Sequence, residues 1–132
     1  MDGSLIDLSK YRLERAKEDL QTARDNFENC SYRASVNRSY YAIFHALRSV
    51  TALDDFDSSK HSGIIGYINH NYVKAGIFDK SFSKYVDSAF RLREKADYDD
   101  FYIVATEDAK RQIKNAEAVI TAVETYASTR WH

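Results

Sequence analysis

The chain has 132 residues, 44% of them hydrophobic, and a formal net charge of -1. One folded domain accounts for this length, and the even charge balance excludes the global basic field of non-specific nucleic-acid binders. The single cysteine excludes an internal disulfide and a multi-cysteine zinc site. No apolar run approaches the roughly 20 residues that cross a bilayer. The stretch "MDGSLIDLSK" lacks the pattern of a secretory signal, so we expect a cytoplasmic protein without a membrane span.

Helical periodicity dominates a chain that has no proline and four glycines. Apolar residues recur at steps of three and four along a first predicted helix, and Asp79 and Thr106 are expected to cap the last two. Ser58 or Ser59 is expected to cap the third. The five predicted helices cover residues 9–29, 32–53, 60–72, 80–96 and 106–129.

This order of elements predicts an all-α, up-and-down bundle of about five helices. The bundle forms a single domain over residues 1–132, with loosely ordered ends at residues 1–8 and 128–132. We expect two copies to form a two-fold dimer.

The second predicted helix carries an arginine and a histidine on one line. On a helical wheel its apolar residues fall within roughly 80° of one another. Arg38 and His45 fall within about 20° of each other on the opposite side, with Tyr41 and Arg48 beside them. The apolar arc consists of Val36, Tyr40, Ile43, Leu47 and Val50.

Arginine and histidine in one strip suit phosphate chemistry. Histidine titrates near neutral pH and can move protons, and arginine can bind a phosphate with two N–H groups. Two helical turns separate Arg38 from His45 by about 10 Å. Either the arginine bends toward the histidine, or the two residues meet across an antiparallel dimer of this helix. An ordinary pair of polar residues on a solvated face is the alternative.

Several other polar residues allow two interpretations. The block "ADYDDFY" is either a solvated acidic loop or a cover for the dimer cleft in which Tyr98 and Phe101 pack inward. His61 and His70 lie on opposite faces of the third helix and cannot share a metal ion, so no metal site is assigned.

Four basic residues also allow two interpretations. Arg48, Arg91, Arg93 and Lys95 form either a local basic patch for RNA or an ordinary solvated face.

Three stretches resemble the HEPN family of prokaryotic helical domains: "YRASVNRSYYAIFHALRSV", "KHSGIIGYINHNYVKAGIFDK" and "RLREKADYDDFY". The resemblance implies a metal-independent endoribonuclease without a cofactor, whose motif of Arg, four to six residues and His lies at a homodimer interface. In this chain the motif is Arg38 and His45, with Asn37, Tyr41 and Arg48 in support.

The resemblance also implies partners. Many HEPN proteins are toxins that pair with a minimal nucleotidyltransferase as antitoxin, and they act on RNA. This chain departs from the pattern at Ser39, which follows the motif arginine, and at Leu47, where toxins silenced by adenylylation have a tyrosine. Some HEPN domains are not catalytic, so a nucleotide-binding or partner-docking module is the alternative function.

Overall fold

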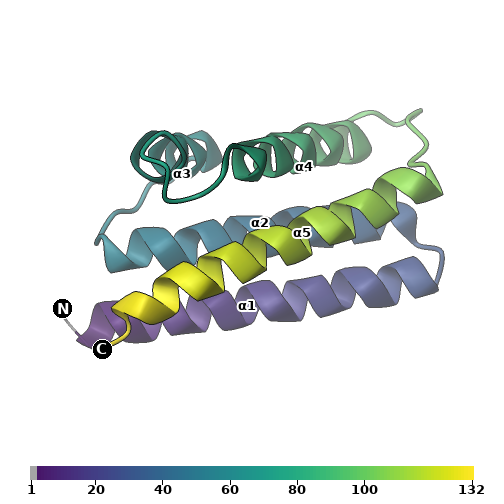
Figure 1. The fold of residues 1–132 in the computed structure, drawn as a ribbon. Coiled ribbons are helices and arrows are strands. Elements are labelled where there is room, and N and C mark those ends of the chain that lie inside the picture. The colour runs from purple at the N-terminus through teal and green to yellow at the C-terminus, as the bar shows by residue number, and fades with distance from the viewer. Residues whose placement is uncertain (1–2) are drawn as a thin grey trace.

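The structure, a computed structural model, describes residues 3–132 and contains no strand within them. Five α-helices make up the fold, which confirms the predicted all-α class. They are α1 (Gly3–Glu28), α2 (Tyr32–Leu53), α3 (His61–Ile68), α4 (Lys80–Tyr98) and α5 (Thr106–Ala127) (Figure 1). Over the described residues, no helix is long and apolar enough to cross a membrane.

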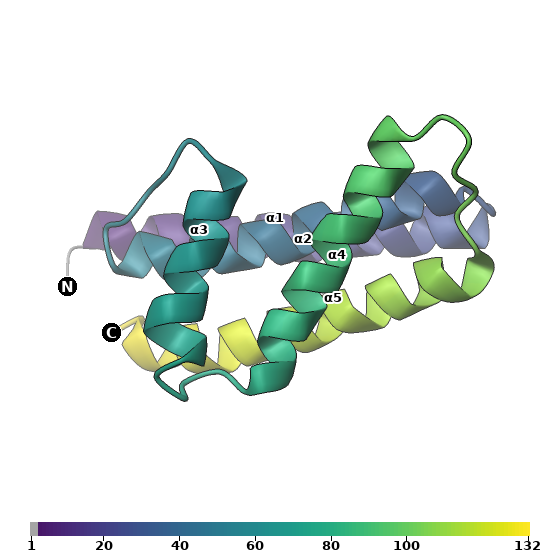
Figure 2. The ribbon, with the colours of Figure 1, turned by 90° about the horizontal axis from the view of Figure 1, so that it is seen from above.

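The helices form two layers. Helices α1, α2 and α5 run along the length of the molecule, and α3 and α4 cross over them (Figure 2). The N-terminal end of α3 and the C-terminal end of α4 both project past α1 and α2 on the same side of the molecule (Figure 2). These two projections border the candidate site described below.

Helix α2 lies at the centre of the fold and has the predicted bounds, Tyr32–Leu53. Its whole predicted apolar arc is buried, because α4 and α5 cover that face. Small residues on another face pack against α1. The hydroxyl of Ser35 donates to the backbone carbonyl of Ala23 at 2.8 Å, and that of Ser49 donates to the carbonyl of Ser9 at 2.7 Å. Both hydroxyls are therefore satisfied where the two helices approach closely.

Within residues 3–132, helical structure extends into both segments that were expected to be loosely ordered. Helix α1 begins at Gly3 rather than at residue 9, and a 3₁₀ turn covers Ser128–Arg130. The indole of Trp131 donates to the hydroxyl of Ser9 at 3.0 Å, so the C-terminal segment packs against the first turns of α1. This tertiary contact extends helical order beyond what local periodicity indicates.

The caps and the third helix differ in part from the prediction. Asp79 caps α4 as expected, since its carboxylate accepts from the backbone N–H of Ser81 at 3.0 Å. The predicted third helix is α3 followed by a π-helical turn, Asn69–Val73. The N-cap residue of α3 is Lys60 and not Ser58 or Ser59. The N-cap residue of α5 is Ala105 and not Thr106.

A polar cluster, called the Asp54 cluster below, closes the end of the bundle where α2 and α5 end. The Asp54 carboxylate accepts from the hydroxyl of Tyr67 at 2.9 Å and from Arg130 Nη1 at 2.8 Å. Tyr72 also donates to it, and Arg130 donates further to Tyr126 at 3.0 Å. Every member therefore has at least one partner within the cluster.

The acidic block after α4 does not pack inward. Tyr98 is 71% exposed, Phe101 94% and Ile103 86%, which agrees with the solvated acidic loop and not with the interpretation in which Tyr98 and Phe101 pack inward. The reason is that α4 continues to Tyr98 and projects beyond the bundle. The chain returns at Tyr102, whose carbonyl accepts from Arg33, and at Val104, which is buried.

Candidate active site

Four side chains on one face of α2, called the α2 strip below, form the centre of the site: Arg38, Tyr41, His45 and Arg48. All are partly buried. The side chain of Arg38 is 36% exposed, that of His45 18% and that of Arg48 27%. The strip is therefore a half-buried surface rather than the solvated face of the alternative interpretation.

Asp19 on α1 brings the arginine and the histidine together. Its Oδ1 lies 3.4 Å from Arg38 Nη1, and its Oδ2 lies 3.5 Å from His45 Nε2. Asp19 is buried, so this carboxylate interacts with both groups in a region of weak solvent screening. Arg38 and His45, two helical turns apart, are thus connected within one chain. The long side chain of Arg38 and the carboxylate of Asp19 on α1 together span the distance.

Asn37 holds the guanidinium of Arg38 in place. Its Oδ1 accepts from Arg38 Nε at 3.0 Å and from Nη2 at 2.7 Å. Its Nδ2 donates to Asp97 Oδ2 on α4 at 3.2 Å. Asn37 therefore orients one edge of the arginine, and the Nη1 side remains for Asp19 and for a ligand.

Arg93 on α4 completes the site from the other side. Its guanidinium lies over the rings of Tyr40 and Tyr41, at 5.1 and 5.4 Å from their centroids, and donates to the Tyr41 hydroxyl at 3.1 Å. Arg93 Nε lies 2.9 Å from Asp97 Oδ2. Since Arg38 also lies 4.9 Å from the centroid of Tyr41, this ring is in contact with two guanidinium groups.

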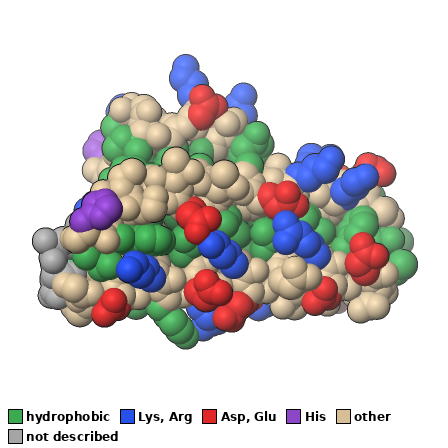
Figure 3. Space-filling model, turned by 60° about the horizontal axis from the view of Figure 1, so that its bottom comes forward, with side chains coloured by type: hydrophobic (Ala, Val, Ile, Leu, Met, Phe, Trp, Pro, Cys, Tyr) green, Lys and Arg blue, Asp and Glu red, His purple; other side chains and the backbone are tan. Residues whose placement is uncertain are grey.

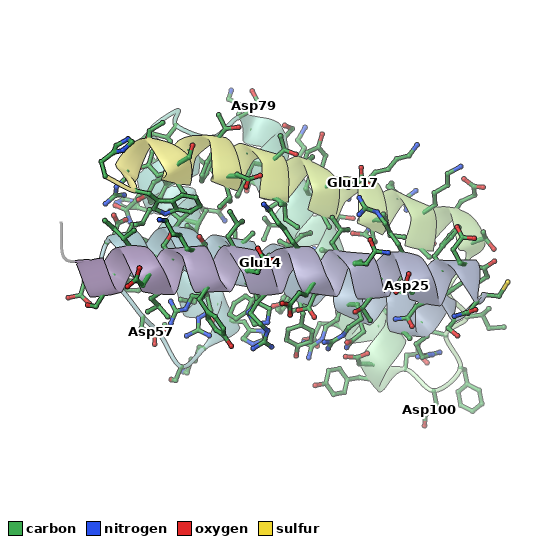
Figure 4. All side chains as sticks on the ribbon, turned by 90° about the horizontal axis from the view of Figure 1, so that it is seen from below. Glu14, Asp25, Asp57, Asp79, Asp100 and Glu117 are labelled. Carbon is green, nitrogen blue, oxygen red and sulfur yellow. The ribbon has the colours of Figure 1, made fainter. Side chains whose placement is uncertain are left out.

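Arg48 extends the strip toward the loop before α3. Its Nη2 lies 3.4 Å from Asp57 Oδ1, and its carbonyl accepts from Arg12 at 3.1 Å. Asp57 and Asp100, both labelled in Figure 4, lie on the same side of α1, away from α5. The strip runs from the loop before α3 to the C-terminal part of α4. Arg48 contacts Asp57 in that loop, and Asn37 near the other end of the strip contacts Asp97 on α4.

Unsatisfied polar atoms are concentrated here. Among the described residues, the buried side-chain N and O atoms without a hydrogen bond of good geometry are Asp19 Oδ2, Ser39 Oγ, Arg48 Nε and Arg93 Nε. Two of them still have ion-pair contacts, Arg93 Nε with Asp97 and Asp19 Oδ2 with His45. Three of these four residues belong to the site. Buried polar groups are normally paired, so their clustering around the α2 strip favours a surface that is completed by a ligand.

The charges around His45 oppose one another. Burial lowers the pKa of His45 below its ordinary value of 6.5. Asp19 raises this pKa, and the positive charges of Arg15, Arg48 and Arg38 lower it. The net lowering leaves the imidazole neutral near neutral pH, which is the state of a proton acceptor, and the carboxylate is placed to stabilise the imidazolium once a proton arrives.

A groove of about 820 Å³ continues from Arg38 along the ends of α1 and α2. Asn37, Asp97, Tyr102 and Ile103 line it, and so does the exposed Cys30, whose φ of 59° lies in the left-handed region. Within residues 3–132, no group of three or more His, Cys, Asp or Glu residues is arranged to hold a metal ion. On the face shown in Figure 3, acidic and basic side chains are interspersed and form no field of one sign.

The structure brings all five predicted site residues together and adds two more. Asp19 was not predicted from the sequence, and Arg93 was predicted only as part of a possible basic patch. The sequence could have indicated both residues, because each is a charged residue at a position in the apolar stripe of its own helix. Asp19 lies between Ala16 and Ala23, and Arg93 follows the buried Ala89 by one turn.

The predicted basic patch is divided. Arg48 and Arg93 belong to the site. Arg91 is directed away from it, with a side chain that is 75% exposed and paired with Asp87.

Sequence comparisons place this site in a family. The HEPN domain model matches residues 9–126. The "UPF0332 protein" of Thermotoga maritima is 31% identical over 87% of both chains. The "Putative toxin MJ0605" of Methanocaldococcus jannaschii is 35% identical over 65% of this chain and 64% of its own length. The chain belongs to the HEPN family, as the resemblance in the sequence indicates.

Proposed function

We propose that this chain is a metal-independent endoribonuclease that acts as a toxin. The observation that carries the proposal is the convergence of Arg38 and His45 on the buried carboxylate of Asp19, on a partly buried face. A proton acceptor, a phosphate-binding cation and a carboxylate that stabilises the charged acceptor are the groups that phosphodiester transfer needs.

The proposed reaction is attack of an RNA 2′-hydroxyl on the adjacent phosphorus. His45 takes the hydroxyl proton, and Asp19 stabilises the imidazolium that forms. Arg38, oriented by Asn37, donates to the phosphate oxygens as negative charge develops on them. Tyr41 and Arg48 extend the surface on which the strand lies, Tyr41 by its ring and Arg48 by its charge.

The biological setting follows from relatives. Two relatives from Methanocaldococcus jannaschii carry the name "Putative toxin". We extend that role to this chain, with a homodimer as the active form and a nucleotidyltransferase as the antitoxin. Expression of the wild-type chain should then arrest growth of a host cell, and co-expression of the nucleotidyltransferase should restore it.

The direct test is cleavage of RNA by the purified protein in excess chelator. Arg38→Ala and His45→Ala should each lose about 10²-fold to 10⁴-fold in rate, the range for removing a proton-transfer or charge-stabilising group. Arg91→Ala and His70→Ala are matched controls, since both side chains are exposed and lie outside the site. Equal rates for all five proteins would contradict the proposal.

A mixing experiment tests whether one chain supplies the whole motif. Because Arg38 and His45 meet on the Asp19 of their own chain, mixed dimers of Arg38→Ala and His45→Ala should stay inactive. Restored cleavage after mixing would show that the arginine of one protomer acts with the histidine of its partner.

The groove beside Arg38 supports the non-catalytic alternative, because it is large enough to hold a nucleotide. As a binding module, the chain would cleave no RNA but would bind a nucleotide or a nucleotidyltransferase with an affinity that Arg38→Ala or Tyr41→Ala weakens. Isothermal titration with ATP and with single-stranded RNA distinguishes the two functions when it is combined with the cleavage assay.

A further inference from the structure

A second histidine, His61, is held against the same face of α2. It is the first residue of α3, and its ring lies on that of Phe44 with centroids 4.1 Å apart. Its Nδ1 lies 2.7 Å from the hydroxyl of the buried Tyr40. Burial raises the pKa of Tyr40, so this hydroxyl keeps its proton and can either donate or accept.

His61 and His45 flank the same two aromatic rings. The ring centroid of Tyr41 lies 6.3 Å from that of His45 and 6.1 Å from that of His61. The centroid of Phe44 lies 6.4 Å from that of His45 and 4.1 Å from that of His61. Two imidazoles from different helices thus border one short stretch of surface.

The two imidazoles differ in whether a carboxylate lies beside them. Arginines act on both, but His45 has the carboxylate of Asp19 at 3.5 Å, whereas His61 is near the guanidinium groups of Arg93 and Arg48, and Glu94 opposes them only weakly. Burial and these two arginines lower the pKa of His61. The pKa of both imidazoles is lowered, but only the imidazolium of His45 has a carboxylate in contact to stabilise it. The imidazolium of His61 lacks such a contact and is therefore the readier proton donor.

One nitrogen of His61 remains available to a ligand. Because Nδ1 is engaged by Tyr40, Nε2 is the free ring nitrogen. His61 also borders a hollow of about 510 Å³ that Arg48, Ser58 and Ser59 line together with Phe44 and Asp57. A phosphodiester in contact with Arg48 would therefore lie next to His61.

We propose that His61 is a second catalytic residue, the general acid of the cleavage reaction. The inference rests on the proposed function. As the 2′-oxygen forms its bond to phosphorus and its proton moves to His45, the bond from phosphorus to the 5′-oxygen breaks and His61 Nε2 gives its proton to that oxygen. The products are a 2′,3′-cyclic phosphate and a 5′-hydroxyl. The Tyr40 hydroxyl holds the ring throughout, accepting from Nδ1–H in the imidazolium.

The test compares two dinucleotide substrates in excess chelator, one with the natural 5′-oxygen and one with a bridging 5′-sulfur. A thiolate leaves without a proton, so the sulfur substrate does not need a general acid. His61→Ala should cleave the oxygen substrate about 10²-fold to 10⁴-fold more slowly than wild type and the sulfur substrate within about tenfold of it. His45→Ala should be slow on both substrates, and His70→Ala should match wild type on both.

A second variant separates catalysis from structure. The side-chain amide of His61→Asn is placed to replace the Nδ1 contact with Tyr40 but has no group at the position of Nε2. It should fold as wild type by thermal unfolding and be as slow as His61→Ala on the oxygen substrate. Wild-type rates for His61→Asn, or equal losses on both substrates for His61→Ala, would overturn the role of His61 and leave the proposed function standing. Absence of cleavage by the wild-type protein would overturn both.

Discussion

Two polar clusters in this molecule contain the same residue types and differ in how completely they are satisfied. The Asp54 cluster and the α2 strip with Asp19 each combine arginine, aspartate and tyrosine. In the first, Arg130 and two tyrosines donate to one carboxylate. In the second, Arg48 Nε has no hydrogen-bond partner, and Asp19 Oδ2 has only the imidazole of His45 at 3.5 Å.

The difference indicates different uses. A saturated cluster gains its full electrostatic energy within the chain and has little left for a ligand, so it contributes to stability. An unsaturated cluster costs folding energy and keeps donors and a charge available. The composition of a polar cluster therefore says less about function than the fraction of its atoms that remain unpaired.

The largest difference between the effect on cleavage and the effect on stability should come from His45→Ala. Cleavage should fall by about 10²-fold to 10⁴-fold, because the proton acceptor is lost. The free energy of unfolding, measured by urea denaturation, should fall by only about 1 kcal/mol, because the side chain that is removed is 18% exposed and its polar contact is a single one, with Asp19 at 3.5 Å. A large stability loss with cleavage intact would reverse the roles of the two clusters.

Asp54→Ala should show the opposite behaviour. It leaves Arg130 and two tyrosine hydroxyls without their acceptor, so the free energy of unfolding should fall by about 3 kcal/mol. Cleavage per folded molecule should stay at the wild-type level. Asp87→Ala is the matched control, because that carboxylate is exposed and pairs with Arg91 at the surface, where an ion pair contributes less than about 1 kcal/mol.

Asp19→Asn tests the link between the arginine and the histidine. The neutral amide no longer stabilises the imidazolium of His45, so cleavage should fall by about tenfold, which corresponds to about 1.4 kcal/mol in the barrier. The pKa of His45, followed by NMR of its ring protons, should move further down. An unchanged or raised pKa would show that Asp19 does not act on His45.

The smallest effect concerns acid stability. The pKa values of His45 and His61 are lowered by folding, so the unfolded chain binds more protons than the folded chain below the unperturbed value of 6.5. Stability should therefore fall as the pH is lowered through this range, because protons favour the unfolded state. Urea denaturation at several pH values should show a weaker dependence in His45→Gln and in His61→Gln than in the wild-type chain.

The sequence predicted the parts of the fold that depend on one helix at a time. The bounds of α2 were correct because its apolar arc and the acidic turn that follows are both local signals. The early start of α1 was missed, because Ser9 and Trp131, far apart in the sequence, hold that turn in place. The π-helical turn after α3 left no local signal that the helical wheel could detect.

For the candidate site, too, the sequence predicted only what lies on one helix. A wheel of α2 places Arg38 and His45 on one line, but it cannot show what approaches that line from α1, α3 and α4. Asp19, His61 and Arg93 join the site only through the packing of these helices. The distance of about 10 Å along the axis therefore suggested a second protomer, whereas a carboxylate on α1 connects the two groups within one chain.

Cys30 has a practical consequence for measurements on the assembled protein. It is the one cysteine of the sequence, it is exposed, and it lines the groove that begins at Arg38. A spin label or fluorophore attached there marks one known point per chain without any substitution. In the proposed homodimer the two labels would define one distance, and the emission of a fluorophore at this position should respond to a molecule that enters the groove.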